Sequence, residues 1–261
     1  MAGISAMKGI FMEILTYGAG ERLRVASSEL SALCGESRII ILPIPTTRDK
    51  RHVFGTQIPL SEVVEACRGG AMVAGYGIPE NIKREIIECG GSVYDGEEDE
   101  ELLSGNAALT ALGALGWILT KLPSSPDEIT FGIVGYGRIG SRLARMLLFF
   151  GAKVRVYSGN SATLRELSEL GVEAYDYRCA ASFDGVDVLI NTAPASIVTK
   201  DRAKGVGRIV ELASGGYLED IPEVIKLASL PEVSFPISAG VLYAERIRKF
   251  FGLGLTKGDK Q

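Results

Sequence analysis

The chain has 261 residues, and its 28 Lys and Arg against 32 Asp and Glu leave a formal net charge of −4. This mildly acidic balance excludes the electrostatic footprint of a nucleic-acid-binding protein. Hydrophobic residues make up 46% and charged residues 23% of the chain, which is ordinary globular usage and excludes a disordered, fibrous or coiled-coil protein.

The first part of the chain alternates strand and helix patterns. Its N-terminal stretch MAGISAMKGIFMEIL is weakly apolar, is interrupted by Glu13 and lacks a clear cleavage site, so we expect no signal peptide. Short apolar runs predict buried strands over Phe11–Thr16, Arg38–Leu42, Ala71–Ala74 and Ser92–Tyr94. Helical periodicity predicts helices over Ser61–Arg68 and Pro79–Cys89. Ser61 has the character of an N-cap for the first of these helices.

A long helix and a linker follow. The acidic run Glu97–Glu101 predicts the solvated start of a helix that reaches Thr120. Its segment Ser104–Thr120 is uncharged and just short of a membrane span, so we expect a buried helix and no membrane contact. The stretch LPSSPDE at 122–128 is a Pro–Ser linker and predicts a domain boundary. We therefore predict an N-terminal α/β substrate lobe with an inter-lobe helix over 1–121 and a dinucleotide-binding domain over 122–238.

The second part repeats the alternation. Strands are predicted over Ile129–Gly135, Lys153–Tyr157, Val186–Asn191, Arg208–Leu212 and Val233–Phe235, and helices over Arg138–Phe150 and Ala162–Leu170. A last helix, Val241–Phe251 within 239–261, is expected to return to the N-terminal lobe. Two consecutive β-α-β series imply an α/β fold with two Rossmann-like, doubly wound parallel sheets and a cleft between the lobes.

The strongest motif is a glycine-rich turn. Its residues are Gly135, Tyr136, Gly137, Arg138, Ile139 and Gly140, in the pattern G-x-G-x-x-G. The turn follows an apolar strand, opens a helix and precedes a second strand, as the dinucleotide fingerprint requires. We expect the pyrophosphate to lie on the helix N-terminus, with Arg138 as an added donor. The alternative is a glycine-rich turn that binds nothing.

The end of the second strand decides the cofactor. An acid at that place would bind a ribose 2′-hydroxyl and select NAD. No Asp or Glu occurs between Gly140 and Glu166, and Ser158, Asn160 and Ser161 offer hydroxyls and an amide instead. The sequence therefore favours NADP, with NAD still possible.

Other strand-end loops are expected to meet the ligands, because ligands bind at the carboxyl edge of such sheets. Substrate-binding candidates are Thr46, Thr47 and Arg48 after one strand and Ser214, Gly215 and Gly216 after another, with Arg48 expected to bind a carboxylate of a dianionic substrate. Further cofactor-binding candidates are Asn191, Thr192, Ala193, Pro194, Ala213, Ala239 and Gly240, the last two in a loop before the final helix. For each loop, ordinary turn chemistry is the alternative.

Candidates for chemistry are few. Asn106 and Thr110 on the long helix are expected to orient the substrate ring, and Glu211 is a candidate acid near a strand end or a structural strand acid. The lone histidine, His52, is expected to be a solvated loop residue because nothing nearby fixes its tautomer. The four cysteines, Cys34, Cys67, Cys89 and Cys179, lack metal-ligand spacing, so we expect no metal and the reduced thiols of a cytoplasmic protein.

Several of these motifs together resemble the dehydrogenase-like component of the dipicolinate synthase family, found in spore-forming bacteria. They are Leu42–Asp49, Asn106–Thr110 with Gly113, Gly135–Gly140, Ile190–Pro194, Leu212–Ser214 and Ser238–Gly240. The resemblance implies two lobes arranged as in 2-hydroxyacid dehydrogenases. It also implies oxidation of a hydroxylated tetrahydrodipicolinate to pyridine-2,6-dicarboxylate during sporulation, with an oxidised nicotinamide cofactor, loss of water and a second, flavoprotein-like subunit. We also expect a homo-oligomer.

Departures from the family pattern lie at places that face the substrate. Leu112 replaces a glutamate, Ile237 replaces a lysine and Gly159 replaces an arginine, while the loop Ala213–Gly216 is shortened. The first strand–helix unit is also curtailed. Because ionisable groups are lost at Leu112 and Ile237, we expect this chain to perform only the oxidation, with dehydration spontaneous or carried out by the partner subunit.

Two alternatives stay open beside this activity. One is an NAD(P)-dependent dehydrogenase or reductase of another small carboxylic acid, and the other is a nucleotide-binding partner protein that has lost its chemistry. A D-2-hydroxyacid dehydrogenase is disfavoured because no histidine follows His52, and a shikimate dehydrogenase because its early Lys and Asp pair is not evident.

Overall fold

The chain forms two compact units in a computed structural model that describes residues 12–33, 37–218 and 221–254. Unit 1 comprises Met1–Gly105 and Phe235–Gln261, and unit 2 comprises Asn106–Ser234. The division falls inside helix α4 (Glu100–Lys121) rather than after residue 121, where the linker predicted it. The reason is packing, because Ala111, Leu115 and other α4 side chains belong to the core of unit 2. Helix α4 is long and apolar enough to cross a membrane, and its residues Ala111, Ala114, Leu115 and Ile118 are buried in the core of unit 2.

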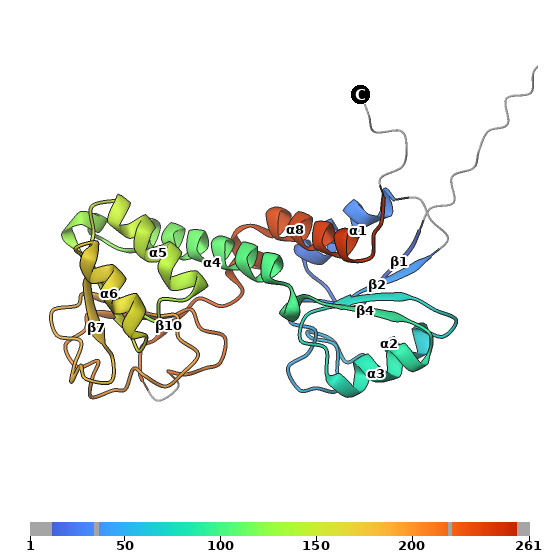
Figure 1. Cartoon of the computed structure of the whole chain (residues 1–261), viewed down its shortest axis with the longest axis horizontal. Helices are drawn as coiled ribbons and strands as arrows, with labels where there is room; N and C mark the ends of the chain where they lie inside the picture. Colours follow the sequence, from blue (N-terminus) through green and yellow to red (C-terminus); the bar gives the residue numbers. More distant parts are fainter. Residues whose placement is uncertain (1–11, 34–36, 219–220, 255–261) are drawn as a thin grey trace, which may run out of the picture. The chain divides into compact units, whose positions relative to one another are not determined.

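Unit 1 is built on a four-stranded parallel sheet in the order β1-β2-β3-β4. Its strands are β1 (Glu13–Thr16), β2 (Arg38–Ile41), β3 (Met72–Gly75) and β4 (Ser92–Asp95). Helices α1 (Glu21–Ser31) and α8 (Pro236–Phe250) cover one face, and α2 (Leu60–Ala66) and α3 (Glu80–Glu88) cover the other (Figure 1). Both faces are therefore buried, as the continuous apolar run of β2 predicts.

Side chains of β2 show how the two faces form. Ile39 and Ile41 pack with Leu23 of α1 and Tyr243 of α8, whereas Ile40 packs with residues of α2 and α3. With the strands in sequential order, crossovers of one hand would place all connecting helices on one face. Helix α1 lies on the opposite face from α2 and α3, so the β1–α1–β2 connection has the opposite hand.

Unit 2 is built on a six-stranded parallel sheet in the order β10-β9-β8-β5-β6-β7. The strands are β5 (Thr130–Val134), β6 (Lys153–Ser158), β7 (Glu173–Asp176), β8 (Val188–Asn191), β9 (Arg208–Glu211) and β10 (Ile225–Lys226). From β5 the sheet is extended in one direction by β6 and β7 and in the other by β8, β9 and β10. The point between β5 and β8 is therefore the topological switch point, where such sheets bind ligands. The two doubly wound parallel sheets confirm the predicted fold class.

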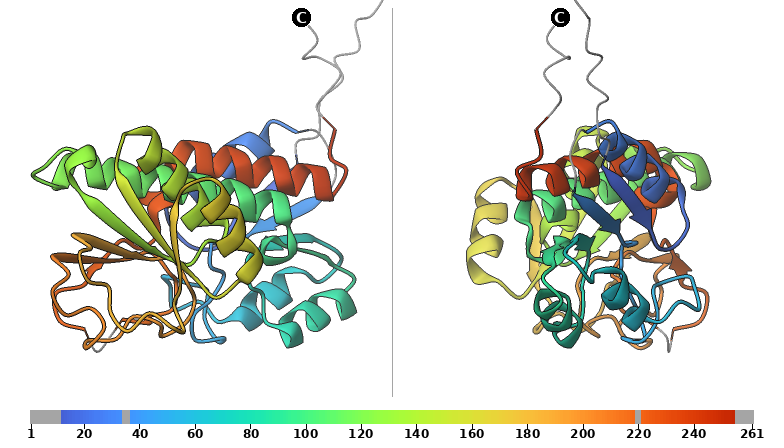
Figure 2. Two further views of the ribbon diagram at one scale, coloured as in Figure 1. Left: turned by 60° about the vertical axis from the view of Figure 1, so that its left-hand side comes forward. Right: turned by 90° about the vertical axis from the view of Figure 1, so that its right-hand side faces the viewer.

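The two faces of the unit 2 sheet are covered differently. Helices α4 and α5 (Arg138–Phe149) lie side by side on one face (Figure 2), where Leu115 and Leu147 pack on Phe131 and Val156. Helices α6 (Ser161–Glu169) and α7 (Leu230–Ser234) contribute Leu167 and Leu230 to the same cluster. The other face packs against residues of connecting loops, namely Phe183, Ile197, Val198, Leu218 and Ile221.

Several elements differ from the sequence prediction. Helix α1 and the short strands β7 and β10 were not predicted, and Phe11 of the first predicted strand lies outside the described residues. The predicted strand Val233–Phe235 is wrong, because Val233 belongs to helix α7 and Phe235 precedes α8. Helix α8 starts at Pro236, so Ser238–Gly240 lie in its first turns and not in a loop before it.

Two predicted helix starts also shift. Helix α2 begins at Leu60 after Pro59, so Ser61 is inside the helix and is not its N-cap. Part of the acidic run forms a 3₁₀ turn, Gly96–Glu98, and Asp99 accepts backbone N–H bonds from Glu101 and Leu102 at the start of α4. The acids thus end one element and cap the next, because a carboxylate satisfies unpaired N–H groups at a helix start.

Candidate functional site

The glycine-rich turn joins β5 to α5 at the carboxyl edge of the unit 2 sheet. Gly135 has a φ of +90°, a conformation that favours glycine, and its N–H donates to the Tyr157 carbonyl at 2.9 Å. A Cβ on Gly140 would overlap the carbonyl oxygen of Gly135, whereas a Cβ on Gly137 would meet no atom within 4 Å. Gly135 therefore permits the tight turn, Gly137 leaves open space above the backbone and Gly140 allows close packing of helix and strand. These are the three roles that glycines have in a dinucleotide-binding turn.

The start of α5 is suited to an anion. Gly137 is the N-cap, no side chain caps the helix, and no acid occurs in its first turn. The first N–H groups of α5 and the positive end of its dipole meet exposed Arg138 there, so a phosphate group fits. Tyr136 and Ile139 are half-buried and pack against the core, so their side chains shape the turn.

The strand ends next to the turn form a row in register. Val134 of β5 pairs with Asn191 of β8, and Asn191 pairs with Glu211 of β9. The Asn191 amide Nδ2 donates to Glu211 Oε1 at 2.9 Å, and the Ala213 N–H donates to the same oxygen at 3.1 Å. Asn191 and Glu211 therefore connect the strand ends from which the loops after β8 and β9 begin.

Glu211 is an unusual group for this position because it is buried. Its side chain is 4% exposed, and Oε2 has no hydrogen-bond partner among the residues that the structure describes. Burial raises the pKa of the carboxyl group, against hydrogen bonds from Asn191 and Ala213 that lower it. Burial therefore disfavours the charged form of Glu211, while Oε1 accepts both hydrogen bonds.

The loop after β8 is tied to the glycine turn. Thr192 Oγ1 donates to the carbonyl oxygens of Val134 at 3.0 Å and Gly135 at 3.2 Å. Ala193 is buried and Pro194 is exposed. Thr192 thus holds the two predicted cofactor loops together at one edge.

The end of β6 holds the residues expected to select NADP. Ser158 is buried and its Oγ accepts a bond from the Asn160 N–H at 3.2 Å. Asn160 caps α6, accepting from Ala162 N at 2.9 Å and Thr163 N at 3.2 Å. Ser161 is exposed in the first turn of α6. The N-terminus of α6 and the Ser161 side chain therefore lie close after the end of β6.

Sequence reasoning missed a charged pair beside this strand end. Asp176 at the end of β7 is in register with Ser158, and Arg178 Nη2 lies 2.6 Å from Asp176 Oδ2. The hydrogen bonds from Arg178 lower the pKa of Asp176 to about 2. The prediction considered only the loop after β6, and the signal that would have found the pair is the short strand β7.

In unit 1 the loop after β2 carries the predicted substrate residues. Thr46 is fully buried, and its Oγ1 accepts the Tyr76 N–H at 2.8 Å, which ties the loop to the end of β3. Thr47 Oγ1 donates to Asp49 Oδ1 at 3.1 Å. The Arg48 guanidinium lies over the Phe54 ring, 4.6 Å from its centre, and the side chain is exposed. Arg48 is thus the member of this set that is presented to an anion.

The prediction that nothing fixes the tautomer of His52 is wrong. Its Nδ1 lies 2.7 Å from Asp49 Oδ2. The bond with His52 and the backbone N–H groups of His52 and Arg51 hold the pKa of Asp49 well below its usual range. The imidazole and the carboxylate therefore form an oriented pair.

Four other predicted residues have evident packing contacts. Thr110 Oγ1 donates to the Asn106 carbonyl at 2.8 Å within α4, while Asn106 Oδ1 is buried with no hydrogen-bond partner among the described residues. Ala239 is buried in α8, and a Cβ on Gly240 would crowd Val25 of α1. Their predicted roles toward ligands stay predictions.

The loop after β9 holds the remaining candidates. Gly216 has a φ of +66°, and a Cβ on Gly215 would overlap the Tyr217 ring. Ser214 is exposed. Within residues 12–33, 37–218 and 221–254, no group of three His, Cys, Asp or Glu side chains is placed to hold a metal.

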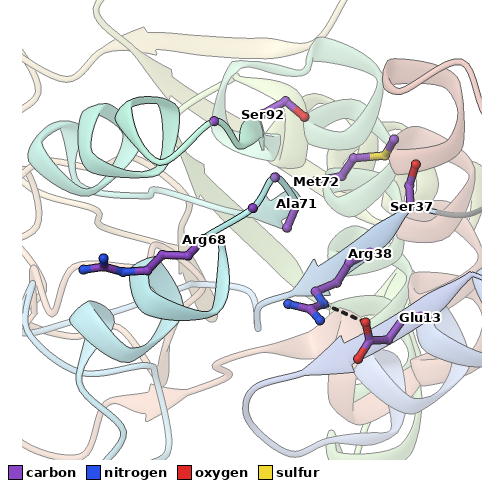
Figure 3. Close-up of a pocket in the computed structure, with 10 residues that line it drawn as sticks. Glu13, Ser37, Arg38, Arg68, Ala71, Met72 and Ser92 are labelled. Atoms are coloured by element: carbon purple, nitrogen blue, oxygen red, sulfur yellow. Dashed lines mark hydrogen bonds and ion pairs between the residues drawn. The ribbon is translucent and has the colours of Figure 1, made fainter.

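A cavity of about 500 Å³ lies at the amino ends of the unit 1 strands (Figure 3). Arg38 in its wall pairs with Glu13 at 2.7 Å, and Arg68 pairs with Glu65 at 2.6 Å. It occupies the opposite edge of the sheet from the loop that carries Arg48. The cavity is therefore separate from the candidate site.

The chain is similar to known dehydrogenase-type proteins, in sequence over one segment and in structure over most of its length. Residues 115–204 match the family described as D-isomer specific 2-hydroxyacid dehydrogenase, NAD binding domain. The dipicolinate synthase component from Bacillus halodurans is similar in structure, with a TM-score of 0.75, 21% identity, and coverage of 94% of this chain and 100% of that one. Its counterpart in the dipicolinate synthase of Bacillus subtilis has a TM-score of 0.75 and 18% identity, over 95% of this chain and 98% of that one.

A more distant structure shares the fold. D-lactate dehydrogenase from Escherichia coli has a TM-score of 0.56 and 14% identity, over 94% of this chain and 98% of that one. No curated protein matches the chain in sequence. The chain therefore has the fold of these dipicolinate synthase components, and residues 115–204 are similar to the NAD-binding domain of D-isomer specific 2-hydroxyacid dehydrogenases, a similarity that indicates a nicotinamide dinucleotide cofactor.

Proposed function

We propose that this chain is an NADP-dependent dehydrogenase that oxidises a hydroxylated tetrahydrodipicolinate toward pyridine-2,6-dicarboxylate. The observation that carries the proposal is the glycine turn at the switch point of the unit 2 sheet, open above Gly137 and followed by an uncapped helix start. The likeness to two dipicolinate synthase structures over nearly the whole chain supports the choice of substrate.

The roles of the chain's own residues follow from where they lie. The N–H groups at the start of α5 and the Arg138 side chain would hold the pyrophosphate. When bound, the oxidised nicotinamide supplies the hydride acceptor. Asn191 and Glu211 shape the neighbouring strand-end loops, and a fixed loop geometry keeps the reacting carbon near the acceptor.

Conversion to the pyridine product requires that the substrate lose one hydride, one proton and one water molecule. Arg48 supports binding of a substrate carboxylate, because its guanidinium is exposed and held in place by the Phe54 ring.

A preference for NADP over NAD rests on charge at the ends of β6 and β7. No acid ends β6, but Asp176 is in register with its last residue, Ser158, and forms an ion pair with Arg178. A guanidinium is a good partner for a 2′-phosphate, whereas Asp176 beside it opposes the same charge. The preference is therefore expected to be small.

The test uses the purified full chain, the hydroxylated substrate and either cofactor. Reduction of NADP, followed by nicotinamide absorbance, together with pyridine absorbance supports the proposal. Turnover with another small hydroxy acid, but not with this substrate, would support the general dehydrogenase alternative. Dinucleotide binding without any turnover would support a nucleotide-binding partner protein. Repeating the assay with a flavoprotein-like second subunit shows whether that partner is needed.

A further inference from the structure

The only histidine of the chain is part of a built acid–base pair. His52 Nδ1 lies 2.7 Å from Asp49 Oδ2, and the other oxygen of Asp49 accepts the N–H groups of Arg51 and His52, each at 2.8 Å. Thr47 Oγ1 adds a third bond to that oxygen at 3.1 Å. The carboxylate is therefore held in one orientation before it meets the imidazole.

The loop that carries the pair is anchored at several points. Phe54 N donates to the Thr46 carbonyl at 2.8 Å, and Leu60 N donates to the Arg51 carbonyl at 2.8 Å. Lys50, between the two members of the pair, has a φ of +62°, a left-handed conformation that lysine rarely adopts. Such local strain persists only where surrounding contacts enforce it, and it is common at functional sites.

The geometry fixes the chemistry of the imidazole. A carboxylate beside Nδ1 keeps the proton on that nitrogen and leaves Nε2 as the atom that exchanges a proton with a ligand. The His52 side chain is 41% exposed, whereas Glu211 is 4% exposed, so His52 is the more accessible acid–base group.

We propose that His52, oriented by Asp49, is the proton-transfer residue for the loss of water from the hydroxylated substrate. This inference rests on the proposed function and assigns to this chain the step for which the sequence showed no catalyst. The carboxylate of the substrate binds Arg48 on the same loop, four residues before His52.

The step balances without a further reagent. The imidazolium gives its Nε2 proton to the substrate hydroxyl, and the C–O bond breaks with its electron pair leaving as water. A proton then leaves the neighbouring carbon, and the electrons of that C–H bond form the new ring double bond. The neutral imidazole takes up this proton, so His52 returns to its starting state.

The test compares variants of the full chain. His52→Gln removes the acid–base nitrogen, and Asp49→Asn removes the acceptor for Nδ1–H. Arg51→Ala changes a charge on the same loop and leaves the pair intact. Pyridine formation should fall about 100-fold or more in His52→Gln, and less in Asp49→Asn, with KM nearly unchanged. Added imidazole should restore part of the rate in a His52→Ala variant, which a merely structural role would not allow.

A second measurement does not depend on turnover. Because the chain has one histidine, its ring nitrogens give a single pair of ¹⁵N signals. We expect them to report a proton on Nδ1, and we expect titration with pyridine-2,6-dicarboxylate to shift the Nε2 signal in the wild type but not in Arg48→Ala. A proton on Nε2 alone, or His52→Gln turnover equal to that of Arg51→Ala, would overturn the proposal. Failure of the wild type to reduce NADP would instead contradict the proposed function, and the ¹⁵N measurement would still decide the assignment of His52.

Discussion

Asn191 and Glu211 lie opposite each other on neighbouring strands, and the Asn191 amide nitrogen is 2.9 Å from Glu211 Oε1. This contact joins the loops after β8 and β9 beside the glycine turn. It places a buried carboxyl group, with one oxygen unpartnered among the described residues, at the edge where the dinucleotide is proposed to bind.

Glu211 should make the protein less stable as the pH rises. Burial raises its folded pKa above the ordinary value of 4.5, so the folded state holds the proton more tightly than the unfolded chain. Stability from this group is present below pH 4.5 and is lost as the pH rises through the folded pKa, by about 1.4 kcal/mol for each unit of difference. Urea unfolding of Glu211→Gln from pH 4 to pH 8 should lack this decline. If the free energy of unfolding of Glu211→Gln fell with pH as steeply as that of the wild type, the decline would not come from Glu211.

Gly137 and Gly140 should respond differently to added side chains. Gly137→Val places its side chain in open space, so the free protein should keep its Tm while losing stabilisation by the dinucleotide. Gly140→Ala should instead destabilise the free protein by about 1–3 kcal/mol, because the new Cβ would overlap the Gly135 carbonyl. Thermal unfolding with and without NADP measures both effects. A normal NADP shift in Gly137→Val would place the pyrophosphate elsewhere.

The glycine turn and the main strands could be predicted because their signals are local. Gly135, Gly137 and Gly140 each answer a requirement within one turn, and apolar runs such as that of β8 identify buried strands. The contact between Asn191 and Glu211, by contrast, joins residues 20 positions apart. It depends on strand order, which no single stretch of sequence contains.

The pairing of Asp49 with His52 was missed for a different reason. The two residues are only three positions apart, and Lys50 between them adopts a left-handed conformation that the sequence pattern does not predict. The same loop is tied to Tyr76 through Thr46, a contact between residues 30 positions apart that the local sequence does not show. Strand β7 was missed because its four residues, Glu173–Asp176, carry little apolar pattern.

Arg178 should control the preference for NADP. Arg178→Ala is expected to weaken NADP binding by about tenfold and to leave NAD binding nearly unchanged, since only NADP carries the 2′-phosphate. Asp176→Asn should tighten NADP binding, because it removes a negative charge that competes for Arg178. Calorimetric titration of both cofactors checks this. Equal losses for NAD and NADP in Arg178→Ala would show a structural role for the pair.

Lys83 should be a main source of stability in unit 1. Its Nζ lies 2.8 Å from Asp95 Oδ2 and 2.6 Å from Glu98 Oε1, and the Asp95 side chain is 3% exposed. Burial alone would raise the pKa of Asp95, but Lys83 and three backbone N–H donors bring it below its usual value. The charged Asp95 therefore stabilises the fold at neutral pH, and this stability is lost as the pH falls through its folded pKa.

Removal of the ammonium group should leave Asp95 charged and poorly compensated. Lys83→Met is expected to lower the free energy of unfolding by about 3 kcal/mol at pH 7, because breaking a buried ion pair strands the remaining charge. The loss should shrink in acid, where Asp95 of the variant takes up a proton. Glu98→Gln is the control, since Glu98 is 73% exposed and its pair should contribute less than about 1 kcal/mol. Urea unfolding at pH 7 and pH 4 decides the matter, and equal losses for the two variants would mean that the Asp95 carboxylate is held by its backbone donors alone.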